Sequence, residues 1–228
     1  MKLLYSNILP LSVGDEEETI IDAFNSQAEK ADRIDIAVGY VSRAALDELN
    51  ELIEKNGISE ISLNIGMYYI EGMPEGSYHT ALRLNQKWQE SGKGEIRLIK
   101  TFKYHGKVYV FYKNGIPFSA IIGSANLGVL KLEANNRRQY ELSAITDSEQ
   151  EVLEIAEHVN KLKAANISAN IKDIVDVPLI QETNTALSGI DLVTEVPTTN
   201  VEFYKRCASY ASFLLPLKVP SYNERHMD

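Results

Sequence analysis

Cysteine is nearly missing from this chain, which contains only Cys207 among its 228 residues. One thiol can form neither an intrachain disulfide nor a thiolate cluster for zinc, so the composition favours a reducing compartment, which we expect to be the cytoplasm. The sequence also lacks an HExxH motif, a P-loop and a cluster of paired carboxylates. We therefore expect no metal site and no cofactor.

Long apolar runs are missing as well. No stretch approaches the roughly 18 consecutive apolar residues that a membrane-spanning helix needs. The N-terminus has one early lysine and then acidic residues in place of the apolar centre of a signal peptide. We expect neither a membrane span nor a signal peptide, and the length suits one large domain, or one domain with a small appendage.

The net charge of −9 argues against a protein that coats nucleic acid over its whole surface. Positive charge is nevertheless concentrated in residues 97–138, which carry a net +7 and leave −16 for the rest of the chain. The cations are Arg97, Lys100, Lys103, Lys107, Lys113, Lys131, Arg137 and Arg138, and the one acid is Glu133. Such a segment suits a localised polyanion such as DNA, with Lys103, Arg137 and Arg138 as candidate phosphate contacts. The alternative is an ordinary solvated face.

Apolar periodicity predicts alternating strands and helices. We expect strands at 33–41, 61–67, 96–100, 107–112, 116–122 and 140–145. We expect helices at 42–55, 78–89 and 147–164, started by Ser42 and by a capping box of Asp147 with Gln150, and a loop at 71–77. This order predicts an α/β sandwich with a mixed, largely parallel central sheet and helices on both faces.

Asn114-Gly115 separates two apolar runs and predicts a tight hairpin between the fourth and fifth strands. His105 and Lys107 then stand at the entrance to the first of these strands. Ser124 and Asn126 stand at the exit of the second. The hairpin therefore brings two separate polar motifs to one edge of the sheet.

These motifs are HxK, formed by His105 and Lys107, and GSxN, formed by Gly123, Ser124 and Asn126. An imidazole can attack phosphorus directly, while an ammonium and a carboxamide can hold the non-bridging oxygens of a phosphate as charge builds up on them. Ser124 is either a hydrogen-bonding member of the site or a turn residue, and Gly123 allows close backbone approach.

On these motifs, residues 1 to about 165 resemble the phospholipase D (PLD) superfamily, and more closely the nuclease domain of NgoFVII-like restriction endonucleases. The resemblance implies DNA cleavage without a metal, through a covalent phosphohistidine. It also implies that residues 166–228 are an extension and linker, leading to a DNA-recognition domain absent from this chain. The family's longer motif expects aspartate where this chain has Tyr112, which weakens a lipase interpretation more than a nuclease one. A carboxylate usually follows GSxN to orient the histidine; Glu141 is our candidate and Glu133 the weaker one.

The superfamily uses two HxK motifs for each site, and this chain has one. Its other histidines, His79, His158 and His226, have no lysine two positions on, so we expect a homodimer with the active site at its interface. We expect His79 and His158 to be structural and assign His226 no role. We favour packing for Tyr104 and for Met67, Tyr68 and Tyr69.

Two other functions stay open at this point. One is a phospholipase or phosphatidyl-transferase activity on lipid phosphodiesters. The other is a non-catalytic PLD-like module that binds nucleic acid. A recognition domain or a partner subunit would then supply base readout, since no helix-turn-helix or zinc finger is evident in the sequence.

Overall fold

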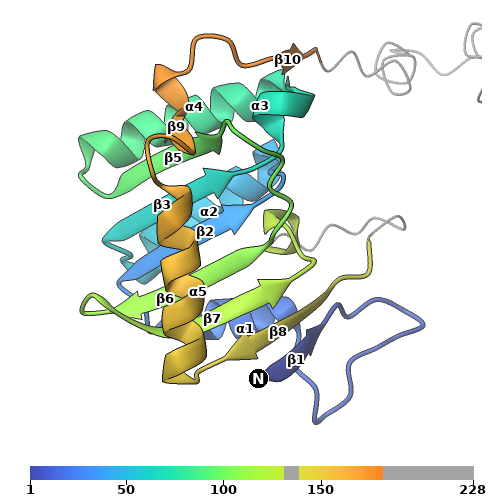
Figure 1. Ribbon diagram of the computed structural model, residues 1–228. Coiled ribbons are helices and arrows are strands. Elements are labelled where there is room, and N and C mark those ends of the chain that lie inside the picture. The colour runs from blue at the N-terminus through green and yellow to red at the C-terminus, as the bar shows by residue number, and fades with distance from the viewer. Residues whose placement is uncertain (131–138, 182–228) are drawn as a thin grey trace, which may run out of the picture. The chain divides into compact units, whose positions relative to one another are not determined.

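The computed structural model describes residues 1–130 and 139–181. Eight strands form one sheet, shown in Figure 1. Across the sheet they are β1 (Lys2–Tyr5), β8 (Leu142–Thr146), β7 (Ile116–Gly123), β6 (Val108–Lys113), β2 (Arg33–Val38), β3 (Glu60–Ile65), β5 (Gly94–Ile99) and β9 (Ser168–Asn170). Two shorter strands, β4 (Met73–Pro74) and β10 (Leu179–Ile180), pair separately.

The sheet is mixed, as predicted, but the expectation that it is largely parallel is wrong. Only the β2–β3 and β3–β5 pairings are parallel, among seven in the described part of the sheet. The helical crossovers α2 (Arg43–Asn56) and α4 (Glu75–Glu90) connect these strands. The other five pairings are antiparallel, and one of them, β6 with β7, is a hairpin.

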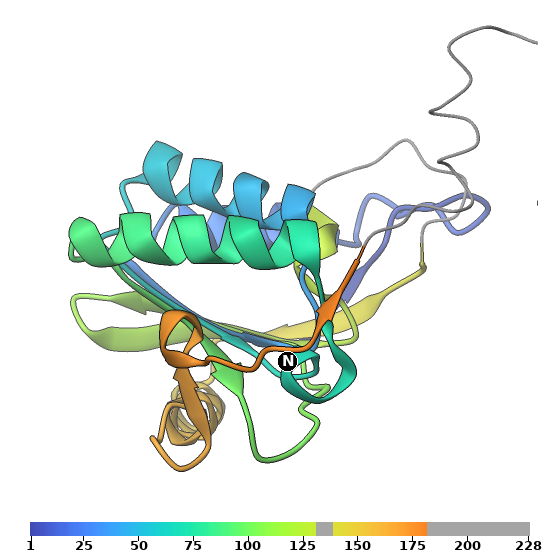
Figure 2. The ribbon, with the colours of Figure 1, turned by 90° about the horizontal axis from the view of Figure 1, so that it is seen from above.

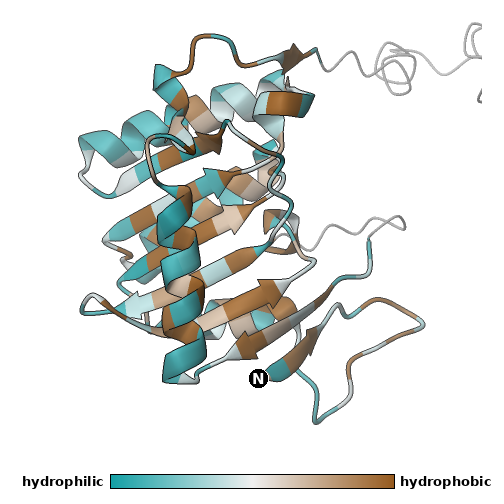
Figure 3. Cartoon of the chain, viewed as in Figure 1, coloured by the Kyte–Doolittle hydropathy of each residue, from teal (hydrophilic) through white to brown (hydrophobic). Residues whose placement is uncertain are grey.

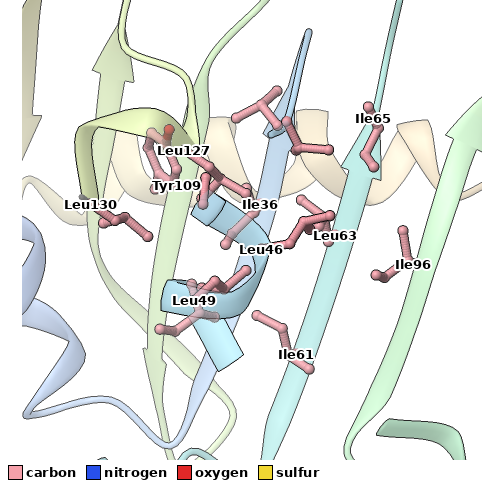
Figure 4. Close-up of a cluster of buried hydrophobic side chains, with 14 of the residues drawn as sticks. Ile36, Leu46, Leu49, Ile61, Leu63, Ile65, Ile96, Tyr109, Leu127 and Leu130 are labelled. Carbon is pink, nitrogen blue, oxygen red and sulfur yellow. The ribbon is translucent and has the colours of Figure 1, made fainter. Parts of the chain in front are cut away.

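Helices cover both faces of the sheet, as predicted. Figure 2 shows α1 (Ile20–Ala28), α2 and α4 on one face and α5 (Glu149–Leu162) on the other. The larger hydrophobic cluster lies under α1, α2 and α4. Figure 4 shows Leu46 and Leu49 of α2 against Ile36 and Leu63 of the strands. A smaller cluster lies under α5. In Figure 3 the hydrophobic colouring is concentrated on the central strands, while α5 alternates between hydrophilic and hydrophobic bands.

Helix α2 follows its local sequence signals. The Ser42 hydroxyl accepts from the Ala45 N–H at 3.2 Å, and Gly57 ends the helix with φ of 65°. The start of α5 differs from the prediction. Ser148 is its N-cap, and Thr146 Oγ1 accepts the Ser148 N–H at 3.2 Å, so the capping box of Asp147 with Gln150 is wrong.

Several elements were not predicted. The expected loop at 71–77 contains the end of α3 (Tyr68–Glu71), β4 and the first turn of α4. Strand β9 lies beyond residue 165 and pairs with β5, and Ile171 after it is fully buried. The compact unit that holds the sheet is Met1–Gln181.

Candidate active site

The β6–β7 hairpin forms as predicted and brings the two motifs together. Asn114 and Gly115 have φ of 52° and 76°, the pair of positive values that a type I′ turn requires. At the other end of the hairpin, the Gly123 N–H donates to the Lys107 carbonyl at 3.1 Å. HxK and GSxN are therefore neighbours at one edge of the sheet.

The alternation of side chains along the strands fixes where Lys107 points. Lys107 shares a face with Tyr109, whose ring packs edge-on against Phe24 of α1 at 5.4 Å between centroids. Gly123 lies beside Lys107 on this face and pairs with Ser143 of β8. A Cβ on Gly123 would lie 2.3 Å from Ser143 Oγ, so only glycine fits between the two neighbouring strands.

Lys107 is buried, with 5% of its surface exposed, and its ammonium donates to the His105 carbonyl at 2.6 Å. Burial lowers the pKa of Lys107, and the charge of Glu141 opposes that shift. No carboxylate of the described residues forms an ion pair with this ammonium. Its charge is thus available to an incoming anion.

Asn126 is oriented by the end of β2. Its Oδ1 accepts the backbone N–H of Tyr40 at 3.1 Å. The amide nitrogen is then left to donate, and no partner for it occurs among residues 1–130 and 139–181. An amide donor and a buried ammonium, both at this end of the hairpin, are suited to hold the oxygens of a phosphate.

His105 is exposed and stands in the loop before β6. Its ring meets the edge of the Tyr40 ring with centroids 5.8 Å apart. Glycines at the ends of two strands make room for this loop: a Cβ on Gly39 would lie 3.1 Å from His105 Cδ2, and one on Gly66 would lie 2.1 Å from the Tyr104 carbonyl oxygen. The Tyr104 N–H also donates to the Gly66 carbonyl at 3.0 Å.

Ser124 and Glu141 lie together at the start of β8. The Ser124 hydroxyl donates to Glu141 Oε2, and it accepts the Leu142 N–H at 3.0 Å. The side chain of Glu141, our candidate for orienting the histidine, is thus held by Ser124. Ser124 in turn fastens the GSxN turn to β8.

Tyr40 and Glu71 belong to the surroundings of His105 and were missed. The Tyr40 hydroxyl donates to Glu71 Oε2 at 2.5 Å, and Lys103 donates to Glu71 Oε1 at 2.9 Å. The hydrogen bonds from Tyr40 and Lys103 lower the pKa of Glu71, and the charge of His105 contributes. Gly39-Tyr40 at the carboxyl end of a buried strand was a usable signal for Tyr40, whereas Glu71 fell within a predicted loop.

Two cations of the basic segment, Arg97 and Lys113, lie away from the candidate site. Arg97 pairs with Glu95 at 2.6 Å, in the part of the sheet next to β9. Lys113 lies at the hairpin turn, 4.0 Å from Asp32. Of the candidate DNA contacts, Lys103 lies near His105, with 53% of its side chain exposed. The predictions for Lys131, Glu133, Arg137, Arg138 and His226 fall outside the described residues.

Several other side chains that the sequence singled out make packing or surface contacts. The Tyr68 hydroxyl donates to the Val41 carbonyl, and Met67 is buried beside it. Tyr104 stacks on His158 of α5 with ring centroids 5.9 Å apart, and burial raises the pKa of Tyr104 to about 12. His79 is exposed and lies 3.6 Å from Glu75.

Tyr112 occupies the position at which the longer superfamily motif has aspartate. It lies at the far end of β6 from Lys107, about 16 Å away at 3.3 Å per residue. Its ring lies under the Arg33 guanidinium at 4.4 Å. A side chain at this position therefore cannot reach a phosphate held by Lys107.

A family model described as "NgoFVII restriction endonuclease N-terminal PLD domain" matches residues 18–176. The chain belongs to this family. Among curated proteins there is no match. The PLD-domain assignment agrees with the resemblance of HxK and GSxN noted above.

Two solved structures are similar to this PLD domain, each at 14% identity and a TM-score of 0.47. One is Nuc, a phospholipase D family member from Salmonella typhimurium, with 74% of this chain and 95% of that chain covered. The other is phosphatidylserine synthase from Haemophilus influenzae Rd KW20, with 92% and 45% covered.

The described ranges contain neither a helix suited to a membrane nor a cluster of metal ligands. No helix in residues 1–130 and 139–181 is long and apolar enough to cross a membrane. In the same ranges, no three His, Cys, Asp or Glu side chains are grouped so that they could hold a metal ion.

Proposed function

We propose that this PLD domain is a metal-independent endodeoxyribonuclease, the catalytic part of a restriction endonuclease that cleaves through a phosphohistidine on His105. One observation carries the proposal: the buried Lys107 ammonium and the oriented Asn126 amide lie at the hairpin edge that presents His105. Together they supply the nucleophile and the phosphate ligands that this chemistry needs.

The reaction has two displacements. In the first, an imidazole nitrogen of His105 forms a bond to phosphorus while the bond from phosphorus to the leaving oxygen breaks. Lys107 and Asn126 hold the non-bridging oxygens, where negative charge increases in the transition state. In the second, water attacks the phosphohistidine, and the nitrogen–phosphorus bond breaks to release the other DNA end. The charge of Lys107 takes the role that a divalent cation has in many nucleases.

A second histidine must protonate the leaving oxygen and later activate the water. This chain has one HxK motif, and the described histidines outside it, His79 and His158, are engaged on helices. We propose that a second copy supplies its own His105 across a two-fold axis. Analytical ultracentrifugation is the test, and a strictly monomeric chain that still cleaves DNA would contradict it.

DNA binding is proposed to involve Lys103 together with Arg137 and Arg138. Selection of a recognition sequence is proposed to reside in a further domain or partner subunit, reached through the residues that follow the sheet. Contacts by lysine and arginine to phosphates strengthen binding without reading sequence. Affinity for DNA should therefore fall as salt rises.

Plasmid nicking with and without EDTA tests the proposed activity. We expect equal cleavage in both conditions, and none by His105→Ala, which should still bind DNA. Cleavage that stops in EDTA and returns with magnesium would contradict the proposal. Binding without any cleavage would favour a non-catalytic module, and activity on phosphatidylcholine vesicles alone would favour a lipid enzyme.

A further inference from the structure

A cavity of about 460 Å³ adjoins the candidate site on the face of the sheet that α1 and α2 cover. Its walls come from the chain after β1, from the first turns of α1 and α2, and from the residues around GSxN. Asn126 and Glu141 line both the cavity and the candidate site. Whatever occupies the cavity is therefore adjacent to the phosphate that Asn126 would hold.

The lining of the cavity is unsuited to a phosphate. Among the described residues that form it there is no lysine or arginine, and two carboxylates, Asp22 and Glu141, belong to it. A phosphate would meet repulsion here and attraction at Lys107. The charged phosphate of an incoming phosphodiester is thus expected at HxK, and an uncharged part of the same molecule is expected in the cavity.

The same lining suits the uncharged part of a nucleotide. Ile8, Ile20 and Val129 provide apolar surface, while Ser42 and Gln139 provide polar groups. Apolar walls with a few convergent polar groups are typical of small-molecule sites, and the volume lies within their usual range of about 300–1,000 Å³. Carboxylate oxygens also accept hydrogen bonds from exocyclic amino groups of bases.

From this juxtaposition we propose that the cavity is a nucleoside subsite, which receives the sugar and base next to the scissile phosphate. This inference rests on the proposed function. It gives the PLD domain a share in choosing the nucleotide at the cleavage point, because the carboxylates favour bases with an amino group over thymine. Entry of a base requires it to leave its stack, so unpaired substrates bind most easily.

Gly128 offers a way to fill the cavity. It lines the cavity, and a Cβ built on it meets nothing within 4 Å, so a larger side chain has space to project without displacing the backbone. Gly128→Phe tests the subsite, and Gly128→Ala is the matched control with the same change in backbone freedom. Ala44→Phe fills the cavity from α2, on another wall.

The assay compares a single-stranded oligonucleotide with methyl 4-nitrophenyl phosphate, a phosphodiester that has no nucleoside and carries only a methyl group beside its leaving group. We expect Gly128→Phe and Ala44→Phe to lower the ratio of oligonucleotide to base-free cleavage about tenfold relative to Gly128→Ala. An unchanged ratio in both phenylalanine variants overturns the proposal, and so does an equal fall in both activities. Circular dichroism checks folding, and if one variant is unfolded the other decides.

A binding measurement separates this proposal from the proposed function. Deoxycytidine 5′-monophosphate is titrated calorimetrically into His105→Ala, which cannot turn over substrate. We expect binding that is weakened about tenfold when Gly128→Phe is added, and weaker binding of thymidine 5′-monophosphate. The proposed subsite is overturned if deoxycytidine 5′-monophosphate binds both variants equally and thymidine 5′-monophosphate binds with the same affinity. The chain without substitutions could fail to cleave DNA while these differences in nucleotide affinity persist. That result overturns only the phosphohistidine mechanism.

Discussion

The backbone N–H of Tyr40 donates to Oδ1 of Asn126 at 3.1 Å, joining residues 86 positions apart. Tyr40 lies two residues after β2, and Asn126 ends the GSxN motif after β7. The bond fixes which end of the Asn126 amide faces the site. It also places the Tyr40 ring against His105. One residue thus positions both an expected phosphate ligand and the expected nucleophile.

The Asn126 side chain has two expected roles, accepting the Tyr40 N–H and donating to a phosphate. Replacing Asn126 by aspartate separates them. Asn126→Asp keeps an oxygen to accept the Tyr40 N–H, but it removes the amide donor and adds a negative charge that repels phosphate. We expect the thermal midpoint to change little and kcat/KM for DNA to fall about 100- to 1,000-fold, the usual effect of losing one transition-state donor. Retention of more than a tenth of the activity would show that the amide does not bind the phosphate.

We expect Lys107 to be required for DNA cleavage without adding to the free energy of unfolding. Its ammonium is buried and, among the described residues, bonded to the carbonyl of His105. Lys107→Met keeps most of the length of the side chain and removes a desolvated charge, so the free energy of unfolding in urea should stay equal or rise. DNA cleavage should fall at least about 100-fold. A variant that is both destabilised and active would reverse our assignment of this residue.

Gly66 should be required for the position of the loop that carries His105. A methyl group there would lie 2.1 Å from the Tyr104 carbonyl oxygen, which is a backbone atom and cannot turn away. Gly66→Ala should therefore displace the loop and lower kcat/KM about tenfold or more. Gly14→Ala is the control, because a Cβ there meets a glutamate side chain at an ordinary 3.7 Å. Equal activity of the two variants would mean that the loop adapts without consequence.

Asp35 should dominate the acid sensitivity of the fold. It is buried in β2, and Arg33 and Lys163 each donate to its carboxylate at 2.7 Å. Burial alone would raise the pKa of Asp35, but these two cations more than offset it, and the pKa lies below its ordinary value of 3.8. The interaction therefore stabilises the fold fully above about pH 4, and the contribution is lost as the pH falls through the lower, folded-state pKa.

Urea unfolding as a function of pH measures this contribution. Asp35→Asn leaves two cations without their carboxylate, and we expect it to lower the free energy of unfolding at pH 7 by about 3–5 kcal/mol. The variant should then lose less stability than the parent chain between pH 5 and pH 2. Parallel pH profiles for the two chains would show that Asp35 does not control the acid limb.

The parts of the fold that local sequence determines were predictable. Ser42 and Gly57 bound α2 because a hydroxyl cap and a left-handed glycine act within a few residues. Asn114 and Gly115 define the hairpin for the same reason, and the hairpin alone brings HxK to GSxN. The core of the candidate site therefore follows from the order of residues along the chain.

The remainder depends on contacts between distant segments. Strand β6 pairs antiparallel with β2 and sets Tyr112 opposite Arg33, a long-range pairing that no local pattern encodes. The three residues of β9 are too short to show a period. The bond of Tyr40 to Glu71 joins the end of one strand to a segment whose sequence is typical of a loop. The places of individual cations depend on such contacts too, since Arg97 and Lys113 lie at different parts of the sheet.

Trapping of the covalent intermediate tests the central claim most directly. A phosphodiester oligonucleotide is mixed with the chain in EDTA, quenched at alkaline pH within the first turnover, and digested for mass spectrometry. We predict a peptide containing His105 that carries the oligonucleotide through a phosphoramidate bond, and none in His105→Gln. Cleavage in EDTA at full rate, with no adduct on His105 at any quench time, would contradict the mechanism.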